Sequence, residues 1–275
     1  MADRASDLLD HLVSTRTRDL AADMVAVMID TPGALVERLD ERIEAFDEET
    51  LAALNDVLPL QSLSLMELSL CVAESGTNLA RAKAFKLAPE TVPERHEAIL
   101  SNLAVRVTTL GIRLSKLGRR EEALAASQEA LDIYRHLAAT RPDAFLPDLP
   151  RSLNNLGVEL SNLGRREEAL VALQEAVDIY RRLAQSCSDA FLPDLARSLG
   201  VLGQALVQAE RHADAANALH EGMETIAPFV KRHAQAFGDL ALTLGRIYIA
   251  ACEEAGAAPD AALLERVTKA LGGPR

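Results

Sequence analysis

Apolar residues along the chain recur at intervals of three and four, which places them on one face of an α-helix. Leu35, Leu39 and Ile43 follow this spacing, and Leu51 and Leu54 continue it. No stretch shows the strict apolar and polar alternation between turn residues that is typical of a strand. The pattern therefore predicts an all-α protein without a sheet. In the first hundred residues we expect helices near residues 3–13, 16–29, 32–45, 48–57, 61–74 and 77–88.

The later part of the chain repeats itself. Residues 110–149 and 156–195, which are offset by 46 positions, are identical at 29 of 40 positions. A third copy with the same offset is legible from Leu202-Gly203 onward, and a fourth begins at Leu244-Gly245, 42 residues later. A fixed period of this length is the mark of a repeat protein, in which each unit buries its apolar face against its neighbours.

Large and small residues recur at the same spacing within each copy. The clearest copy carries Leu153, Leu156, Gly157, Leu160, Ala169, Leu173 and Ala176 at these positions. The preceding copy has Val107, Leu110, Gly111, Leu114, Ala123, Ser127 and Ala130, and the next has Leu199, Leu202, Gly203, Leu206, Ala215, Leu219 and Gly222. This spacing resembles the motif of the tetratricopeptide repeat, a helix-turn-helix unit. The long period is similar to that of kinesin light chain-like and bacterial multi-repeat proteins. The resemblance implies a right-handed solenoid of helical hairpins with one concave and one convex face.

Charge divides the chain into two parts. Residues 1–100 hold 19 acidic and 9 basic side chains, whereas residues 101–275 hold 22 and 20. We expect an acidic helical N-terminal region at residues 1–95 and, at residues 96–275, about three full repeats followed by a partial one. The N-terminal region has two interpretations: a cap with degenerate repeats that shields the first strong repeat, or a small acidic adaptor domain.

The net charge of −12 disfavours nucleic acid and anionic membranes as partners. The three cysteines are widely spaced and form no C-x-x-C pair, which favours a reducing compartment. The first ten residues carry acids and lack the apolar core of a secretory signal, and no apolar run is long enough to cross a bilayer. We therefore expect a soluble, cytoplasmic protein.

Sequence motifs for catalysis are missing. The chain has no phosphate-binding loop, no dinucleotide fingerprint, no nucleophile elbow and no H-E-x-x-H zinc motif. His220 and Glu224, with His212 two turns earlier, could share a metal ion, but surface polar residues explain them better. The basic pairs Arg119-Arg120 and Arg165-Arg166 recur with the period, and the acids that follow them indicate a solvated charged edge. We expect no enzymatic activity, no cofactor and no metal.

The resemblance implies a binding surface on the concave face, which the first helix of each repeat lines. Asn, Gln and Thr side chains can bond the backbone of a peptide, and Arg can pair with its acids. The carboxylate-clamp pattern of chaperone-binding relatives is only partly present. The candidate residues are Arg151, Asn154, Asn155, Val158, Ser161 and Asn162 in the best copy, Thr108, Thr109, Ile112 and Lys116 before it, and Arg197, Gln204 and Gln208 after it.

These observations favour a non-enzymatic scaffold, adaptor or regulatory subunit that binds a protein segment in the concave groove. One alternative is a self-assembling protein that pairs copies through the acidic N-terminal region or through the C-terminal helix at residues 260–271. Another is a regulatory partner of a bacterial defence or signalling effector, such as a caspase-like protease.

Overall fold

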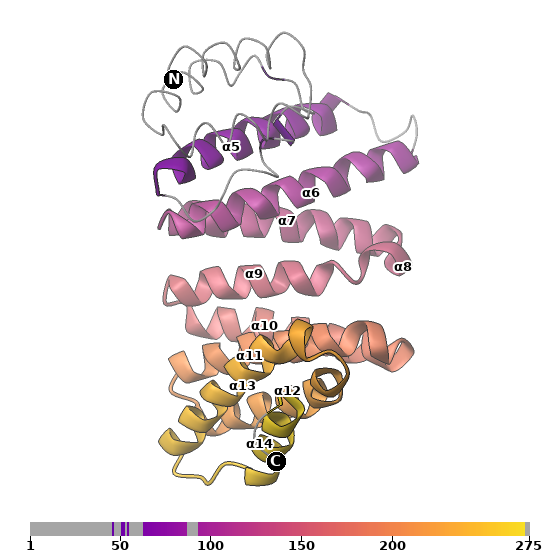
Figure 1. Ribbon diagram of the computed structural model, residues 1–275. Coiled ribbons are helices and arrows are strands. Elements are labelled where there is room, and N and C mark those ends of the chain that lie inside the picture. Colours follow the sequence, from indigo (N-terminus) through magenta and orange to yellow (C-terminus); the bar gives the residue numbers. More distant parts are fainter. Residues whose placement is uncertain (1–45, 47–50, 53, 55–62, 87–92, 273–275) are drawn as a thin grey trace, which may run out of the picture. The chain divides into compact units, whose positions relative to one another are not determined.

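The computed structural model describes residues 46, 51–52, 54, 63–86 and 93–272, and every regular element among them is a helix (Figure 1). The prediction of an all-α fold is confirmed. The chain divides into two compact units, residues 1–137 and 138–275, which we describe separately. The boundary predicted near residue 95 stays a prediction.

The first unit contains α5 (Leu63–Lys86), α6 (Pro93–Lys116) and most of α7 (Arg120–Thr140). Helix α5 packs on α6, and α6 shares with α7 a core that includes Val107, Leu110, Ala123 and Ala126. Arg81 of α5 donates from Nε to Oε1 of Glu129 on α7 at 2.9 Å. The unit is thus held by an apolar layer and an ion pair between helices that are not adjacent in sequence.

The helices predicted for the N-terminal region agree with the structure only in part. The structure has one continuous helix, α5, where the sequence predicted two helices divided near Gly76. Thr77 is fully buried and a Cβ on Gly76 would lie 2.7 Å from Nη1 of Arg106, so α6 packs closely over the expected break. The predicted helices near 3–13, 16–29 and 32–45 lie outside the described residues. Of the helix predicted near 48–57, residues 51, 52 and 54 are described and are helical.

The second unit is a succession of helical hairpins. Each helix from α9 to α12 packs against the next one in sequence, α12 packs on α13, and α14 rests on α12 and α13. In Figure 1 these helices run from salmon to yellow. The elements are α8 (Pro142–Phe145), α9 (Leu149–Asn162), α10 (Arg166–Ser186), α11 (Ser188–Gln208), α12 (His212–Arg232), α13 (Ala234–Glu254) and α14 (Ala261–Ala270).

The turn inside each hairpin has the same geometry. Gly164 follows α9 with φ of 75°, its N–H donates to Ser161 O at 2.9 Å, and the next N–H, of Arg165, donates to Leu160 O at 2.8 Å. This left-handed cap satisfies the last carbonyls of the first helix and reverses the chain. Gly118 repeats it after α6, and after α11 Glu210 holds φ of 61°. The period in the sequence is therefore a period in backbone geometry.

Close packing within the hairpins depends on small residues. A Cβ added to Gly157 of α9 would lie 2.5 Å from Cγ of Leu173 on α10, well inside van der Waals contact. A Cβ added to Gly203 of α11 would likewise lie 2.5 Å from Cγ of Leu219 on α12. Ala169, near the start of α10, is fully buried. Gly157 therefore lies at the contact between the two helices of its hairpin, with Leu173 as its partner.

Candidate functional site

The candidate residues of the first unit lie on α6. Thr108 and Thr109 donate their hydroxyl hydrogens to the carbonyls of Ala104 and Val105, one turn earlier in the same helix. Such bonds occupy the hydroxyl donor but leave its oxygen able to accept. Ile112 and Lys116 are exposed. This helix therefore offers acceptors, one apolar side chain and one cation.

In the second unit, α9 carries the best-matched candidates. Arg151 is 72% exposed, its Nη1 lies 3.8 Å from Oδ1 of Asp148, and Val158 is 38% exposed. Asn162 is also exposed, whereas Asn154 and Asn155 are half-buried. An arginine held so loosely can exchange its partner for a carboxylate of another chain, because exposed ion pairs contribute little free energy.

Helix α11 continues this surface. Arg197 is 59% exposed and donates from Nη1 to Oδ1 of Asp194 at 2.7 Å, and Gln204 and Gln208 are exposed. The two helices are in contact, and Oγ of Ser198 donates to Oδ1 of Asn154 at 3.0 Å. The structure thus brings the α9 and α11 candidates onto neighbouring helices. We call them the first-helix face: Arg151, Asn154, Asn155, Val158, Asn162, Arg197, Gln204 and Gln208.

Helix α13 adds residues that the sequence reasoning missed. The 42-residue offset between Leu202 and Leu244 aligns Arg246 with Gln204 and places Leu242 and Ile249 at further positions of the same face. All three side chains are exposed, and α13 contacts α11. The offset was visible in the sequence and could have identified them. They add one cation and two apolar groups.

The recurring basic pairs make ion pairs within the chain. Arg119 and Arg165 donate from Nε to Glu122 at 2.6 Å and to Glu168 at 2.7 Å, and these hydrogen bonds lower the pKa of both carboxyls. Arg211 makes the equivalent contact with Asp214. The acids that follow each pair therefore neutralise it locally, which supports the interpretation of a solvated charged edge.

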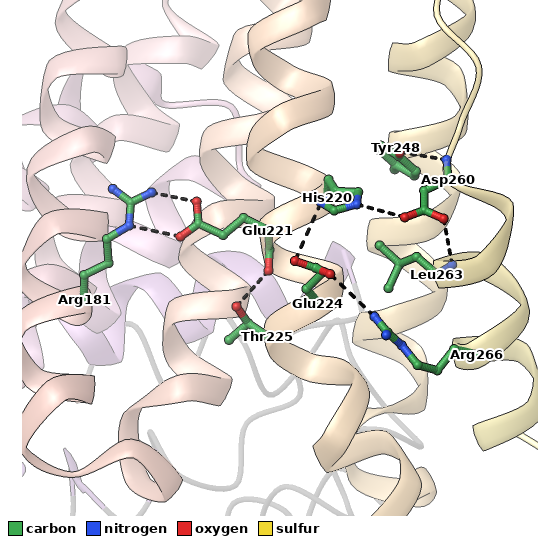
Figure 2. A network of polar contacts seen from close by, with 9 residues as sticks. All are labelled: Arg181, His220, Glu221, Glu224, Thr225, Tyr248, Asp260, Leu263 and Arg266. Atoms are coloured by element: carbon green, nitrogen blue, oxygen red, sulfur yellow. Dashed lines mark hydrogen bonds and ion pairs between the residues drawn. The ribbon is translucent and has the colours of Figure 1, made fainter.

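His220 belongs to a polar network between α12, α13 and α14 (Figure 2). Its Nε2 lies 3.3 Å from Oδ2 of Asp260, and its Nδ1 lies 4.0 Å from Oε2 of Glu224. Asp260 caps α14 by accepting from the N–H groups of Ala262 and Leu263, and its own N–H donates to the Tyr248 hydroxyl at 3.0 Å. The hydrogen bond from the Leu263 N–H is the largest cause that lowers the pKa of the Asp260 carboxyl, and the hydrogen bond with the His220 side chain lowers it further. These contacts serve to dock α14.

Within the described residues, no three metal-ligating side chains converge. Across that same part of the chain, no helix combines the length and apolar character needed to cross a membrane.

A family comparison matches two of the repeats. The model of the family "Tetratricopeptide repeat" matches residues 103–139 and 151–186. These segments contain the α6–α7 and α9–α10 hairpins over most of their length. No curated protein matches the chain.

At least one solved structure shares the fold. BtubC (BKLC) from P. vanneervenii superposes with a TM-score of 0.55 over 94% of this chain and 95% of its own, at 16% identity. The TPR2AB domain of yeast Sti1, in a complex with pHSP90, gives a TM-score of 0.28 over 85% and 98% at 12% identity. Cut9, from the Cut9–Hcn1 hetero-tetramer of APC/C, gives 0.25 over 96% and 69% at 14% identity. Only the first superposition is close enough to show a common fold.

Proposed function

Because this chain carries tetratricopeptide repeats, which are scaffolds for protein interactions, we propose that it is a non-enzymatic adaptor whose first-helix face binds a protein segment bearing carboxylates. The observation that carries the proposal is a pair of exposed arginines, Arg151 and Arg197, at equivalent positions of two contacting helices. Nothing in the packing of either helix requires a cation there, since both side chains point largely into solvent.

The chemistry of the face suits an acidic segment. A guanidinium can bond a carboxylate through two parallel N–H groups, which fixes orientation as well as charge. Half-buried Asn155 and exposed Gln204 and Gln208 can donate to and accept from a peptide backbone. Val158 provides an apolar contact beside them. The segment that fits best carries at least two acids and a small apolar residue.

Self-assembly through the C-terminal helix is the second candidate, and the packing of α14 disfavours it. Leu263 and Val267, on the apolar side of α14, are buried within this chain, and α14 contacts α12 and α13. A second copy could pair with α14 only by displacing these contacts. Light scattering at two concentrations tests this directly, because self-assembly requires a mass that rises with concentration.

The test of the proposed function is the Arg151→Ala, Arg197→Ala double variant, measured against a purified partner. Each lost hydrogen bond to a charged group contributes about 1.5 to 3 kcal/mol, and every 1.4 kcal/mol is about tenfold in affinity. We therefore expect at least a hundredfold loss. Asn154 is left unchanged because it already accepts from Ser198. The double variant should unfold like the parent, since both side chains are exposed.

The matched control removes two arginines elsewhere. Arg165 and Arg166, at the N-terminus of α10, are also exposed, and Arg165 is paired with Glu168. Arg165→Ala with Arg166→Ala should leave the affinity within about threefold of the parent, because these residues lie off the proposed face. If the partner instead tolerates loss of Arg151 and Arg197 and requires Arg165 and Arg166, the hairpin turns carry the binding.

A further inference from the structure

A groove runs along α10 on another side of the second unit. Its walls are α10 and α12, the second helices of successive hairpins, its floor is α11, and it encloses about 820 Å³. We call it the second-helix groove. The α10 residues that line it extend from Glu167 to Arg182. At 1.5 Å per residue this is about 22 Å, the length of four helical turns.

The second-helix groove and the first-helix face lie on opposite sides of α11. Leu202 and Leu206 line the groove, whereas Gln204 and Gln208 belong to the face. Leu202 and Gln204 are two positions apart, as are Leu206 and Gln208. Two positions correspond to a rotation of about 200° around a helix of 3.6 residues per turn. A ligand in the groove would therefore leave the first-helix face free.

The apolar content of the groove centres on Val171. At 71% exposure, Val171 is the most exposed large hydrophobic side chain among the described residues. The equivalent positions of the neighbouring repeats, Ala125 and Asn217, are also exposed, so the repeat packing does not require valine there. Leu170 of α10 and, at the floor, Leu202 and Leu206 of α11 line the groove as well. An exposed valine above a leucine floor is the arrangement that an apolar side chain of a partner would cover.

The charge of the groove favours a basic partner. Five carboxylates and three arginines line it. Two of these arginines are already paired: Arg181 donates to Glu221 at 3.0 Å from Nε and lies 3.1 Å from Asp178, and Arg211 donates to Asp214 at 2.8 Å. Figure 2 shows the side chain of Arg181, on α10, directed at the carboxylate of Glu221, on α12. The excess of two acids leaves the groove negative, and Glu167 at one end is exposed.

We propose that the second-helix groove binds a basic amphipathic helix of a partner protein, which lays its apolar stripe over Val171 and sets its cations against the acidic walls. The length, the exposed valine and the charge each fit such a helix, which is a common ligand of apolar grooves. Together with the first-helix face, this makes the chain an adaptor with two sites of opposite charge preference.

The probe is a fluorescein-labelled helix of about 18 residues, built from Leu and Lys with one apolar stripe. It is measured by fluorescence anisotropy with the full chain at about 0.15 M salt, where long-range attraction is screened. A peptide of the same composition without the stripe and a Leu/Glu helix serve as comparisons. We expect the Leu/Lys helix to bind at least tenfold more tightly than either. Equal binding of the stripeless peptide would reduce the effect to net charge and overturn the proposal, as would no binding at all.

Variants locate the site. Val171→Lys should weaken binding at least tenfold by removing the apolar contact and adding a like charge, and Val171→Ser should weaken it by a smaller factor. Val158→Lys, which makes the same change on the first-helix face, should leave the affinity within twofold. Equal affinity for all variants, or an equal loss with Val158→Lys, rejects the groove. If the parent self-associates and Val171→Lys abolishes this, the occupant is a second copy and the proposal fails. The Arg151→Ala, Arg197→Ala variant should bind the Leu/Lys helix as tightly as the parent does. This measurement therefore separates the test of the groove from the test of the first-helix face.

Discussion

Replacing Gly157 with Ala should destabilise the second unit, although the same change at Gly111 should not. Alanine in a helix interior is more favourable than glycine by about 1 kcal/mol, so propensity alone predicts a stabilising change at both sites. At Gly157 the new methyl group would lie 2.5 Å from both Cγ and Cδ2 of Leu173. At Gly111 the nearest atom, Cβ of Ala126, is 3.4 Å away, and Oγ of Ser127 is 3.5 Å away.

The magnitude follows from comparing the two sites. Forcing an extra carbon into a filled contact costs roughly 1 to 3 kcal/mol. Leu173 is fully buried, and Cγ is not its flexible end, so the leucine can yield only by moving other core residues. Since the propensity gain is common to both variants, the difference between their free energies of unfolding isolates the overlap. We expect Gly157→Ala to be less stable than Gly111→Ala by about 1 to 3 kcal/mol.

Urea denaturation followed by circular dichroism measures this difference, with both variants compared with the parent in one buffer. A double-mutant cycle with Leu173→Ser adds a control, because serine is the residue that the preceding repeat carries at this position. Leu173→Ser alone loses a buried side chain, but it should remove the penalty of Gly157→Ala, leaving a favourable coupling of about 1 kcal/mol or more. If Gly157→Ala stabilises the protein as much as Gly111→Ala does, the contact between Gly157 and Leu173 is wrong.

Two further outcomes are expected. Ala169→Leu should lower the free energy of unfolding by roughly 1 to 3 kcal/mol, because Ala169 is fully buried near the start of α10; an unchanged urea midpoint would contradict the hairpin register. Asp260 should make the docking of α14 sensitive to acid: its pKa is lowered in the folded chain, so its contribution is present above its ordinary pKa and is lost as the pH falls through the lowered value. Hydrogen exchange of the α14 amides should therefore speed up relative to those of α12 as the pH falls below 3.8, the ordinary pKa of the carboxyl, and Asp260→Ala should abolish this difference.

Local sequence predicted the helices and turns of the repeats well. Gly164 and Gly118 end first helices in the left-handed conformation that glycine favours, and the acids after Arg165 and Arg119 begin second helices. These features depend on residues within a few positions of one another. The predicted first-helix residues Arg151, Val158 and Arg197 are exposed for the same reason, since the motif fixes which side of a helix faces the core.

Identical sequence did not always give identical structure. Residues 143–149 and 189–195 share all seven letters, yet the first copy divides into α8 and α9 while the second lies within α11, with Pro193 inside the helix. The residues before them differ, Arg141-Pro142 in one copy and Cys187-Ser188 in the other. In the second copy Asp189 also lies 3.3 Å from Arg232 of α12. A proline removes one helical hydrogen bond in both copies, so the surroundings decide whether the helix continues.

The sequence by itself determined which segments are helices, where hairpins turn and which side of each helix is apolar, because each of these depends on neighbours within a turn or two. Tertiary structure alone decided the contacts between repeats. The hydroxyl of Ser198 donates a hydrogen bond to Oδ1 of Asn154, 44 residues away in the sequence. Arg181 likewise donates to the carboxylate of Glu221, 40 residues away. The second-helix groove depends on three helices at once, and Val171 becomes a candidate contact only because α11 and α12 pack beside it. No period along one chain specifies such a surface, since its shape depends on how closely successive hairpins approach each other.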